Sequence, residues 1–495
     1  MDQLLDALNQ WKPFRAIVVG DLMLDRLVHG EASRLSSDAP VPVLRVERRE
    51  DQAGGAANLC LNLAAMGASV TVVGLLGDDS EGAILRSKLD EGGIDTSALI
   101  VDPSRPTTSK QNLIGLAQAR HPQKMFRVDV ESTEAPDEQT EAKLLAAFEA
   151  TLPEADAVCI EDYNKGVCAP RLCAAMIDRA RSAGVPVFVD PASVNDYAKY
   201  KGATAITPNR TEAERATGMP THADASPEHN VKLARALLES LELEAVVLTL
   251  DRHGALLLTR DDPTPIPVPT IAREVYDVTG AGDMMLAGLA SARANGVPWR
   301  GSVQLANAAA GLEVEVFGVA PIPIEQIHHE ILALHAGKGC SRRTLDEALV
   351  QVRAARSAGK KIVFTNGCFD VIHAGHVHLL EQTALQGNLL IVGLNSDASV
   401  KRLKGESRPL NSEGDRARVL GALGSVDAVV VFDEDTPIRL IEAIRPDVLV
   451  KGGDYTRDGV VGAEIVEQSG GRVEIIPLVD GLSTTATIER MKSRE

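Results

Sequence analysis

Three histidines, His373, His376 and His378, lie within six positions in the stretch CFDVIHAGHVHLLEQT (368–383). Imidazole can bind a metal ion, move a proton or donate a hydrogen bond to a phosphate. On a helix, His373 and His376 are three residues apart and share a face, whereas His378 turns away from His376. A zinc site needs a third or fourth ligand directed at the same point, and the nearest candidate is Cys368. The residues alone leave a metal site and a phosphate site open.

The sequence around these histidines favours phosphate. A buried strand pattern, KIVFTNG (361–367), precedes them, and a helix is predicted to begin near Ala374. Backbone N–H groups and the helix dipole attract an anion there, and Gly375 leaves space for it. Two imidazoles on this face can donate hydrogen bonds to charge that builds on phosphoryl oxygens.

A second stretch with chemical potential is EVYDVTGAGDMMLAGLASA (274–292). A strand-like run ends in Gly280, Ala281 and Gly282, Asp283 follows, and an apolar helix begins at once. The N–H groups of the glycine turn and of the helix N-terminus form an anion hole for a transferring phosphoryl group. Asp283 is placed to take a proton from an attacking hydroxyl. The pattern therefore predicts phosphoryl transfer to an alcohol.

Polar residues that suit a sugar occur early in the chain. Two aspartates follow the strand AIVVG (16–20), and a glycine pair with a nearby asparagine opens the predicted helix in AGGAANLCLNLAAMGA (53–68). Glycines let a ligand approach the backbone closely, and carboxylates and amides bind hydroxyl groups. Taken alone, the glycine segment also fits a tight turn before a packed helix. The candidates are Asp21, Asp25, Gly54, Gly55 and Asn58.

Basic residues near the predicted sugar site would suit a substrate that already carries a phosphate. Each of them singly is also compatible with an ordinary surface charge. They are Arg34, Lys110, Arg127 and Lys165.

The elements that must position these residues alternate between short β-branched runs and amphipathic helical segments. Continuous apolar runs between helices are typical of parallel strands that are buried on both faces. Ligands bind at the carboxyl ends of such strands. The predicted fold class is therefore α/β. Predicted strands include 16–20, 70–77, 185–190, 245–250, 361–367, 389–396 and 447–453.

A change of pattern at 317–343 indicates two domains. This segment has two prolines, a helical stretch and a Gly/Lys/Arg-rich tract, after which a new helix and strand begin. We expect a first domain at 1–336, a linker at 337–343 and a smaller second domain at 344–495.

Composition excludes several classes of protein. The 495 residues carry a net charge of −18, which argues against a nucleic-acid-binding protein. The six cysteines form no C-x-x-C pair, and neither a signal-peptide pattern nor a membrane-length apolar run occurs. We expect a cytoplasmic enzyme with no nucleic-acid and no membrane partner.

Beyond this reading of the residues, DVTGAGD together with GGAAN resembles the ribokinase-like (PfkB) family of sugar kinases, over roughly residues 14–330. The resemblance implies that Asp283 is the catalytic base and that 280–282 form the anion hole. TPNRTE matches the family's N-x-x-E element, which implies that Asn209 and Glu212, with Arg210 and Thr211 between them, hold ATP and its magnesium. The family's T-x-G-x-x-G turn appears as TLDRHG, with Asp251 where a glycine is common.

The histidine stretch resembles the H-x-G-H signature of a nucleotidyltransferase superfamily that includes cytidylyltransferases, over about 361–490. The resemblance implies that His373, His376 and Lys451 (of VKGGDY) stabilise the transition state. It also implies a nucleotide site made of Thr365, Gly367, Phe369, Gly375, Asp397, Lys404, Arg408, Ser483, Thr484 and Thr485. The arginine that usually precedes those last hydroxyls is missing here.

Both motif sets in this order resemble the family of bifunctional heptose 7-phosphate kinases and heptose 1-phosphate adenylyltransferases of lipopolysaccharide synthesis. The fold implied is a ribokinase-like domain followed by a smaller Rossmann-like nucleotidyltransferase domain. The implied substrates are ATP and a phosphorylated heptose, with Mg²⁺ carried by ATP near Glu212 and no zinc. We also expect a homodimer.

A separate heptose bisphosphate phosphatase is implied as a pathway partner. VVVFDEDTP (429–437) looks like the start of a haloacid-dehalogenase-type phosphatase, but its threonine falls one residue early, so we expect no phosphatase in this chain. Two rival interpretations remain. One is a PfkB kinase fused to a cytidylyltransferase for another phosphorylated alcohol, and the other is a sensor built on inactive enzyme folds.

Overall fold

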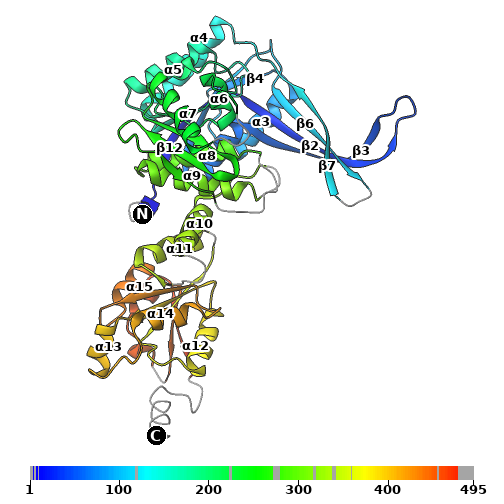
Figure 1. The fold of residues 1–495 in the computed structure, drawn as a ribbon. Helices are drawn as coiled ribbons and strands as arrows, with labels where there is room; N and C mark the ends of the chain where they lie inside the picture. The colour runs from blue at the N-terminus through cyan, green and yellow to red at the C-terminus, as the bar shows by residue number, and fades with distance from the viewer. Residues whose placement is uncertain are drawn as a thin grey trace. The chain divides into compact units, whose positions relative to one another are not determined.

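The computed structural model describes residues 4, 7–8, 10–117, 121–221, 226–270, 279–315, 319–336, 342–357, 359–453 and 456–477. The chain forms two compact units, Trp11–Ile324 and Glu325–Glu495, and Leu4–Gln10 groups with the second (Figure 1). The sequence places the boundary slightly later, at 337–343, and where each domain ends as an independent folding unit stays a prediction.

A nine-stranded sheet with the order β13-β12-β11-β10-β9-β8-β1-β4-β5 organises the first unit. The central strands β1 (Phe14–Gly20), β4 (Ala68–Leu76), β8 (Ala157–Glu161), β9 (Val187–Asp190), β10 (Ala205–Ile206) and β11 (Ala245–Thr249) pair in parallel. β5 (Leu99–Val101) extends one edge in parallel, and β12 (Ala255–Thr259) and β13 (Ile266–Val268) extend the other edge as antiparallel strands. The predicted parallel α/β sheet is confirmed.

Helices cover both faces of this sheet because its strands are apolar on both sides. One face packs against α4 (Glu138–Thr151), α5 (Pro170–Ser182) and α7 (Pro227–Ser240). α2 (Ala56–Ala65) and α8 (Ala281–Ala294) lie on the other face, and α9 (Trp299–Glu313) packs on α8. Among the described residues, this unit also contains the α-helices α3 (Ser80–Glu91) and α6 (Arg210–Thr217).

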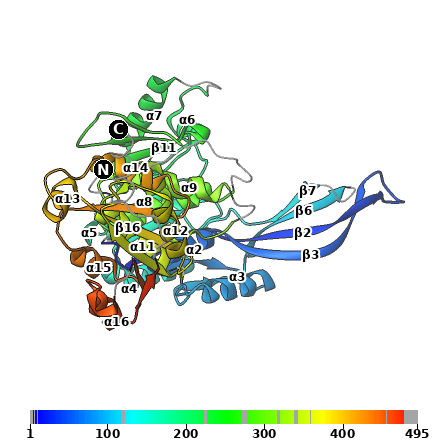
Figure 2. The same ribbon diagram turned by 90° about the horizontal axis from the view of Figure 1, so that it is seen from below.

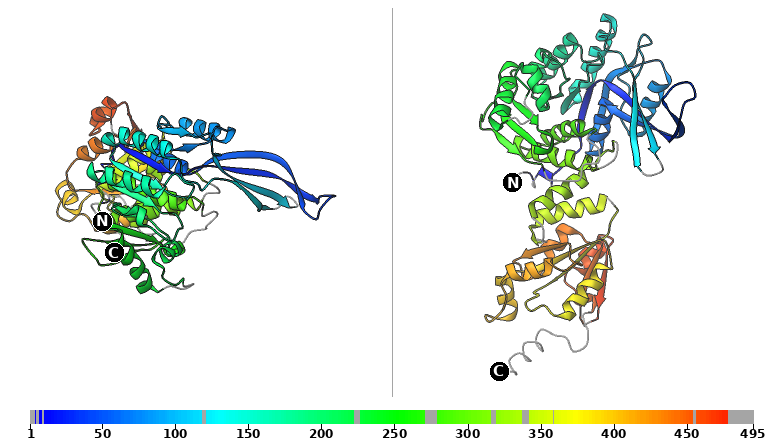
Figure 3. Two further views of the ribbon diagram at one scale, coloured as in Figure 1. Left: turned by 90° about the horizontal axis from the view of Figure 1, so that it is seen from above. Right: turned by 45° about the vertical axis from the view of Figure 1, so that its right-hand side comes forward.

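A four-stranded sheet extends from this body, and the sequence patterns did not reveal it (Figures 2 and 3). Its order is β3-β2-β6-β7, with β2 at Leu22–Leu35, β3 at Pro42–Gly55, β6 at Thr108–Ala117 and β7 at His121–Val130. The β2–β6 pair is parallel and the outer pairs are antiparallel. β2 begins two residues after β1 ends, so this sheet, here called the lid sheet, starts at the carboxyl edge of the large sheet.

The second unit has a six-stranded parallel sheet with the order β14-β17-β16-β15-β18-β19. Its strands are β14 (Arg342–Arg343), β15 (Ile362–Gly367), β16 (Leu389–Asn395), β17 (Ala428–Phe432), β18 (Val448–Gly452) and β19 (Arg472–Ile476). Ile362 and Phe364 belong to one core cluster and Val363 to another, so both faces are buried. The helices are α10 (Ile324–Ala336), α11 (Leu345–Ser357), α12 (Ala374–Ala384), α13 (Asp397–Lys404), α14 (Glu413–Gly421), α15 (Ile438–Ile444) and α16 (Ala463–Gln468).

Candidate active sites

The glycine turn of the first unit opens a helix, as predicted. Gly280 is the N-cap residue of α8 with a φ of +88°, a backbone conformation that glycine adopts without strain. A side chain at this position would also reach to 2.6 Å from the carboxylate of Glu313. The turn therefore requires glycine, and it leaves the N–H groups at the start of α8 available to an anion.

Asp283 lies in the first turn of α8, and its side chain is buried. Its carboxylate accepts hydrogen bonds from Asn58 Nδ2 at 2.6 Å and from the hydroxyl of Tyr163 at 2.9 Å. Burial raises the pKa of Asp283 to about 6, although the two hydrogen bonds favour the ionised form. The carboxylate is therefore mainly ionised at neutral pH and more basic than an exposed aspartate, which suits a general base.

The structure brings several of the predicted sugar residues together around Asp283. Asp25 on β2 is the register partner of Lys110 on β6, and the charges of both act on the pKa of Asp283. At Gly54, an added Cβ would lie 2.3 Å from Asp25 Oδ2, so only glycine fits beside that carboxylate. Gly55 has a φ of +56° and begins the turn into α2, which carries Asn58. The lid sheet thus contributes to the same site as α8.

Asp21 and Lys165, which were also predicted to bind sugar, have partners within the protein. The Asp21 carboxylate accepts hydrogen bonds from the backbone N–H groups of Tyr163, Lys165 and Val167 at 2.8–3.1 Å. Lys165 Nζ forms an ion pair with Glu131 at 2.7 Å. Asp21 therefore anchors the 163–167 segment. Direct sugar contacts by Asp21 and Lys165 stay predictions.

Sequence reasoning missed two carboxylates beside Asp283. Oxygens of Glu161, Asp190 and Asp283 all lie within 4.8 Å of one another. Burial raises the pKa of Glu161 and of Asp190, and Glu161 Oε2 has no hydrogen-bond partner among the described residues. Carboxylate oxygens are the ligands that Mg²⁺ prefers. Glu161 ends β8 and Asp190 ends β9, so their position at the carboxyl edge of parallel strands was the available signal.

The N-x-x-E element forms a helix cap. Asn209 is the N-cap of α6 and accepts a hydrogen bond from the backbone N–H of Glu212, whose carboxylate accepts one from the backbone N–H of Asn209. Glu212 also lies near Asp190, since its charge raises the pKa of Asp190. Arg210 is half-buried and Thr211 is exposed. The cap alone explains Asn209 and Glu212 structurally, and the ATP contacts of all four residues stay predictions.

In the second unit, His373 is the N-cap of α12 and His376 lies in its first turn. Their ring centroids are 4.0 Å apart, and the ring of Phe369 lies 5.4 Å from that of His376. Gly375, which lies between them in the sequence, is buried. His378, which was predicted to turn away from His376, is exposed. The two imidazoles therefore lie together at a helix N-terminus.

The charges of this site are set by burial. Burial, with the charges of His373 and Lys404, lowers the pKa of His376 to about 4, and burial also lowers the pKa of His373. Both imidazoles are therefore neutral near pH 7, and each can donate one ring N–H. Burial lowers the pKa of Lys451 to about 8, and its Nζ donates to Asn366 Oδ1 at 2.6 Å. Thr365 donates to Val450 O at 2.9 Å, which joins β15 to β18.

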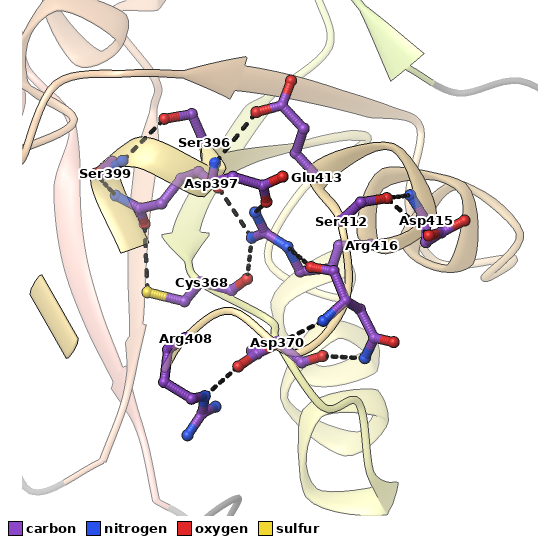
Figure 4. A network of polar contacts seen from close by, with 12 residues as sticks. Cys368, Asp370, Ser396, Asp397, Ser399, Arg408, Ser412, Glu413, Asp415 and Arg416 are labelled. Atoms are coloured by element: carbon purple, nitrogen blue, oxygen red, sulfur yellow. Dashed lines mark hydrogen bonds and ion pairs between the residues drawn. The ribbon is translucent and has the colours of Figure 1, made fainter. Parts of the chain in front are cut away.

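A buried arginine and a buried aspartate tie together the loops around the histidines (Figure 4). Arg416 donates to the backbone oxygens of Cys368 and Asn395 and forms an ion pair with Asp397 at 2.7 Å. Arg408 forms an ion pair with Asp370. Asp397 and Arg408, both predicted nucleotide ligands, thus have protein partners, and their contacts with a nucleotide stay predictions.

The remaining predicted nucleotide residues divide into two groups. Gly367 ends β15, Phe369 lies in the segment between β15 and α12, and Lys404, whose charge acts on His376, ends α13. Ser483, Thr484 and Thr485 lie outside the described residues.

Within the described part of the chain, the carboxylate cluster at Asp283 is the one group of three or more His, Cys, Asp or Glu side chains that could share a metal ion. No helix in that part is long and apolar enough to cross a membrane.

Comparison with solved structures identifies the fold of the first unit. Phosphofructokinase-2 from Escherichia coli in complex with potassium aligns with a TM-score of 0.53 at 18% identity, covering 65% of this chain and 99% of that one. Arabidopsis thaliana ribokinase complexed with ribose and ATP aligns with a TM-score of 0.50 at 22% identity, covering 65% and 99%. The predicted ribokinase-like fold is confirmed.

Sequence comparison covers nearly the whole chain. Residues 15–326 match the model of the pfkB family carbohydrate kinases, and residues 364–489 match the cytidylyltransferase-like model. "Bifunctional protein HldE" of Geotalea uraniireducens (strain Rf4) is 44% identical over 482 residues, 97% of this chain and 96% of the relative. The protein of the same name from Bradyrhizobium sp. (strain ORS 278) is 44% identical over 483 residues, 96% of each. The predicted sugar kinase and nucleotidyltransferase are thus confirmed, and the chain belongs to the family of bifunctional HldE proteins, with a pfkB-family carbohydrate kinase as its first part.

Proposed function

We propose that the first unit phosphorylates D-glycero-β-D-manno-heptose 7-phosphate at its anomeric hydroxyl. We further propose that the second unit transfers an adenylyl group from ATP to heptose 1-phosphate, which yields ADP-heptose and pyrophosphate for lipopolysaccharide core synthesis. The observation that carries the proposal is the buried base Asp283, which lies at a helix N-terminus and beside Lys110 of the lid sheet.

In the first reaction, Asp283 removes the proton of the anomeric hydroxyl as that oxygen attacks the γ-phosphorus of ATP. The N–H groups at the start of α8 donate to the transferring phosphoryl group. Mg²⁺ bound with ATP would neutralise phosphate charge, and Glu161, Asp190 and Glu212 are the nearby carboxylates that could hold it. Lys110 supplies a positive charge on the sugar side of the base.

In the second reaction, an oxygen of the sugar 1-phosphate attacks the α-phosphorus of ATP, and pyrophosphate leaves. His373 and His376 donate ring N–H groups to the phosphoryl oxygens, and the ammonium of Lys451 neutralises their charge. The ring pair at the N-terminus of α12 supports this assignment. Lys404, at the basic C-terminal end of α13, and Arg408 would approach the triphosphate as the nucleotide binds.

The two reactions do not connect directly, because the first product is a 1,7-bisphosphate and the second substrate has a free 7-position. A separate phosphatase must remove the 7-phosphate between them. Purified protein supplied with Mg²⁺, ATP and heptose 7-phosphate should therefore stop at the bisphosphate, as mass spectrometry would show. Adding a phosphatase specific for the 7-phosphate should release pyrophosphate and yield ADP-heptose.

Parallel reactions with CTP in place of ATP test the nucleotide of the second step. Pyrophosphate release with CTP but not with ATP would contradict the adenylyltransferase assignment. ADP-heptose formation without the added phosphatase would contradict the proposed order of steps.

We also propose that the protein is a homodimer in which a second copy covers the lid sheet. Phe126, Val128 and Val130 alternate along β7 and therefore share one face, with exposures of 66%, 40% and 43%. Exposed apolar groups of this kind are typical of interaction surfaces. Light scattering should show a dimer for the wild type and a shift toward monomer for Phe126→Lys. A wild-type monomer at micromolar concentration would contradict this assembly.

A further inference from the structure

Two donors from separate parts of the fold hold the two oxygens of the Asp283 carboxylate. Asn58 on α2 donates to Oδ2 at 2.6 Å, and the hydroxyl of Tyr163, in the segment after β8, donates to Oδ1 at 2.9 Å. A carboxylate with one donor on each oxygen cannot rotate without breaking a hydrogen bond. Its remaining lone pairs therefore face a fixed direction.

The segment that carries Tyr163 is itself held firmly. The backbone N–H of Tyr163 donates to Asp21 Oδ2 at 2.9 Å, and the N–H groups of Lys165 and Val167 donate to the same carboxylate. On the other side, Asp162 forms an ion pair with Lys199 at 2.5 Å. Because these contacts fix the backbone, the phenol is presented to Asp283 from a constrained position.

The side chain of Tyr163 combines an accessible ring with a hydroxyl directed inward. The residue is 36% exposed, so it is not a core residue, yet its hydroxyl reaches the buried carboxylate of Asp283. Lys110 Nζ lies 5.0 Å from the centroid of the ring, within the range of a cation–π interaction. Core packing does not require a partly exposed ring whose hydroxyl points inward. Such a ring is expected if it forms a wall of the acceptor site.

We propose that Tyr163 is a positioning residue for phosphoryl transfer, which orients the Asp283 carboxylate through its hydroxyl and forms a wall of the sugar site with its ring. This proposal rests on the assignment of Asp283 as the base. Burial and the charge of Asp283 raise the pKa of the Tyr163 hydroxyl, so it stays protonated and acts as a donor.

Tyr163→Phe separates the hydroxyl from the ring. The kinase kcat should fall roughly 10- to 100-fold, the value of a hydrogen bond to a charged group, while the KM for the sugar stays within about twofold. Tyr163→Leu, which also removes the ring, should raise the sugar KM as well. Tyr197→Phe is the matched control, because the buried hydroxyl of Tyr197 has no hydrogen-bond partner among the described residues. Its kinetic constants should match those of the wild type.

A double-mutant cycle with Asp283→Asn tests whether Tyr163 acts through the base. If it does, Tyr163→Phe should lower the residual rate of Asp283→Asn by less than about twofold, because the coupled carboxylate is already absent. Losses that multiply, or a Tyr163→Phe variant that changes KM alone, would overturn the proposal. Near-normal turnover of Asp283→Asn would instead overturn the base assignment, so the two failures are distinguishable. Thermal unfolding of each variant, compared with that of the wild type, reports that the first unit is folded.

Discussion

The imidazole rings of His373 and His376 lie 4.0 Å apart, centroid to centroid, with their planes inclined by 32°. Two protonated imidazoles at this distance would repel each other, and burial with this proximity keeps the pKa of His376 near 4. The pair is therefore suited to donate two neutral N–H groups to one phosphoryl group at the N-terminus of α12.

Substitution His376→Ala should lower adenylyl transfer by roughly 100-fold or more, because it removes a donor to transition-state charge. Kinase turnover should not change, since Asp283 belongs to the other unit. His378→Ala is the matched control on the same helix, because His378 is exposed and should be replaceable without loss. Added zinc should not restore the variant. Stoichiometric zinc in the wild type that is lost with His376 would revive the metal interpretation.

The pH dependence of adenylyl transfer should follow Lys451 and not His376. Its ammonium form is needed to neutralise phosphate, and its pKa is about 8, so kcat/KM for ATP should fall as pH rises through 8. His376 stays neutral down to about pH 4, so protonation of His376 should not lower the rate between pH 5 and 7. Lys451→Arg, whose side chain stays charged, should lack the alkaline fall. An unchanged alkaline fall in this variant would show that another group titrates.

Asp283→Asn should lower kinase turnover by roughly 10²- to 10⁴-fold, the usual contribution of a general base. The amide keeps the shape of the side chain, so the KM for the sugar should change little. Asp261→Asn, at an exposed position, serves as the control. Assays that couple ADP release to absorbance measure the chemistry, and thermal unfolding of the same variant detects any loss of folding.

Asp370→Asn should destabilise the second unit. Asp370 has 1% of its side chain exposed, pairs with Arg408 and accepts backbone hydrogen bonds from Leu410 at 2.6 Å and Asn411 at 3.1 Å. Removing one charge leaves Arg408 largely buried without its partner, at a cost of about 3 kcal/mol. Glu434→Gln breaks the exposed ion pair with Arg439 and should cost less than about 0.5 kcal/mol. Denaturant unfolding measures the free energy of unfolding that each variant loses. Equal losses would contradict the view that the buried Asp370–Arg408 pair contributes more to stability than the exposed Glu434–Arg439 pair.

Separate expression should produce two soluble fragments with one activity each, since each unit has its own sheet and core. The cut proposed from sequence gives 1–336 and 344–495. The second unit of the structure begins at Glu325. Burial, together with the charge of Arg353 on α11, lowers the pKa of His328 on α10 to about 3, so α10 and α11 lie close together. A fragment 325–495 should therefore unfold at a higher temperature than 344–495. Equal stability would favour the later boundary.

The amino-acid sequence by itself determined the α/β class and the presence of a helix N-terminus at each of the two motifs. α12 begins at Ala374, as predicted, and α8 begins at Ala281, two residues before the predicted start at Asp283. Both helix starts were predictable because a glycine turn and a helix start depend on residues that are neighbours in the chain. The strands ending at Gly20 and Gly367 were likewise predictable from continuous apolar runs.

Only the tertiary structure decided which side chains meet. Tyr163 and Asn58 bind Asp283 from 120 and 225 residues away, and neither distance leaves a local pattern in the sequence. The lid sheet escaped prediction because its long outer strands are largely exposed and lack an apolar run. Asp21 has the type and place of a sugar ligand, yet three backbone N–H groups occupy its carboxylate. Residue type limits what a side chain can bind, but the groups that surround it in the fold determine what it does bind.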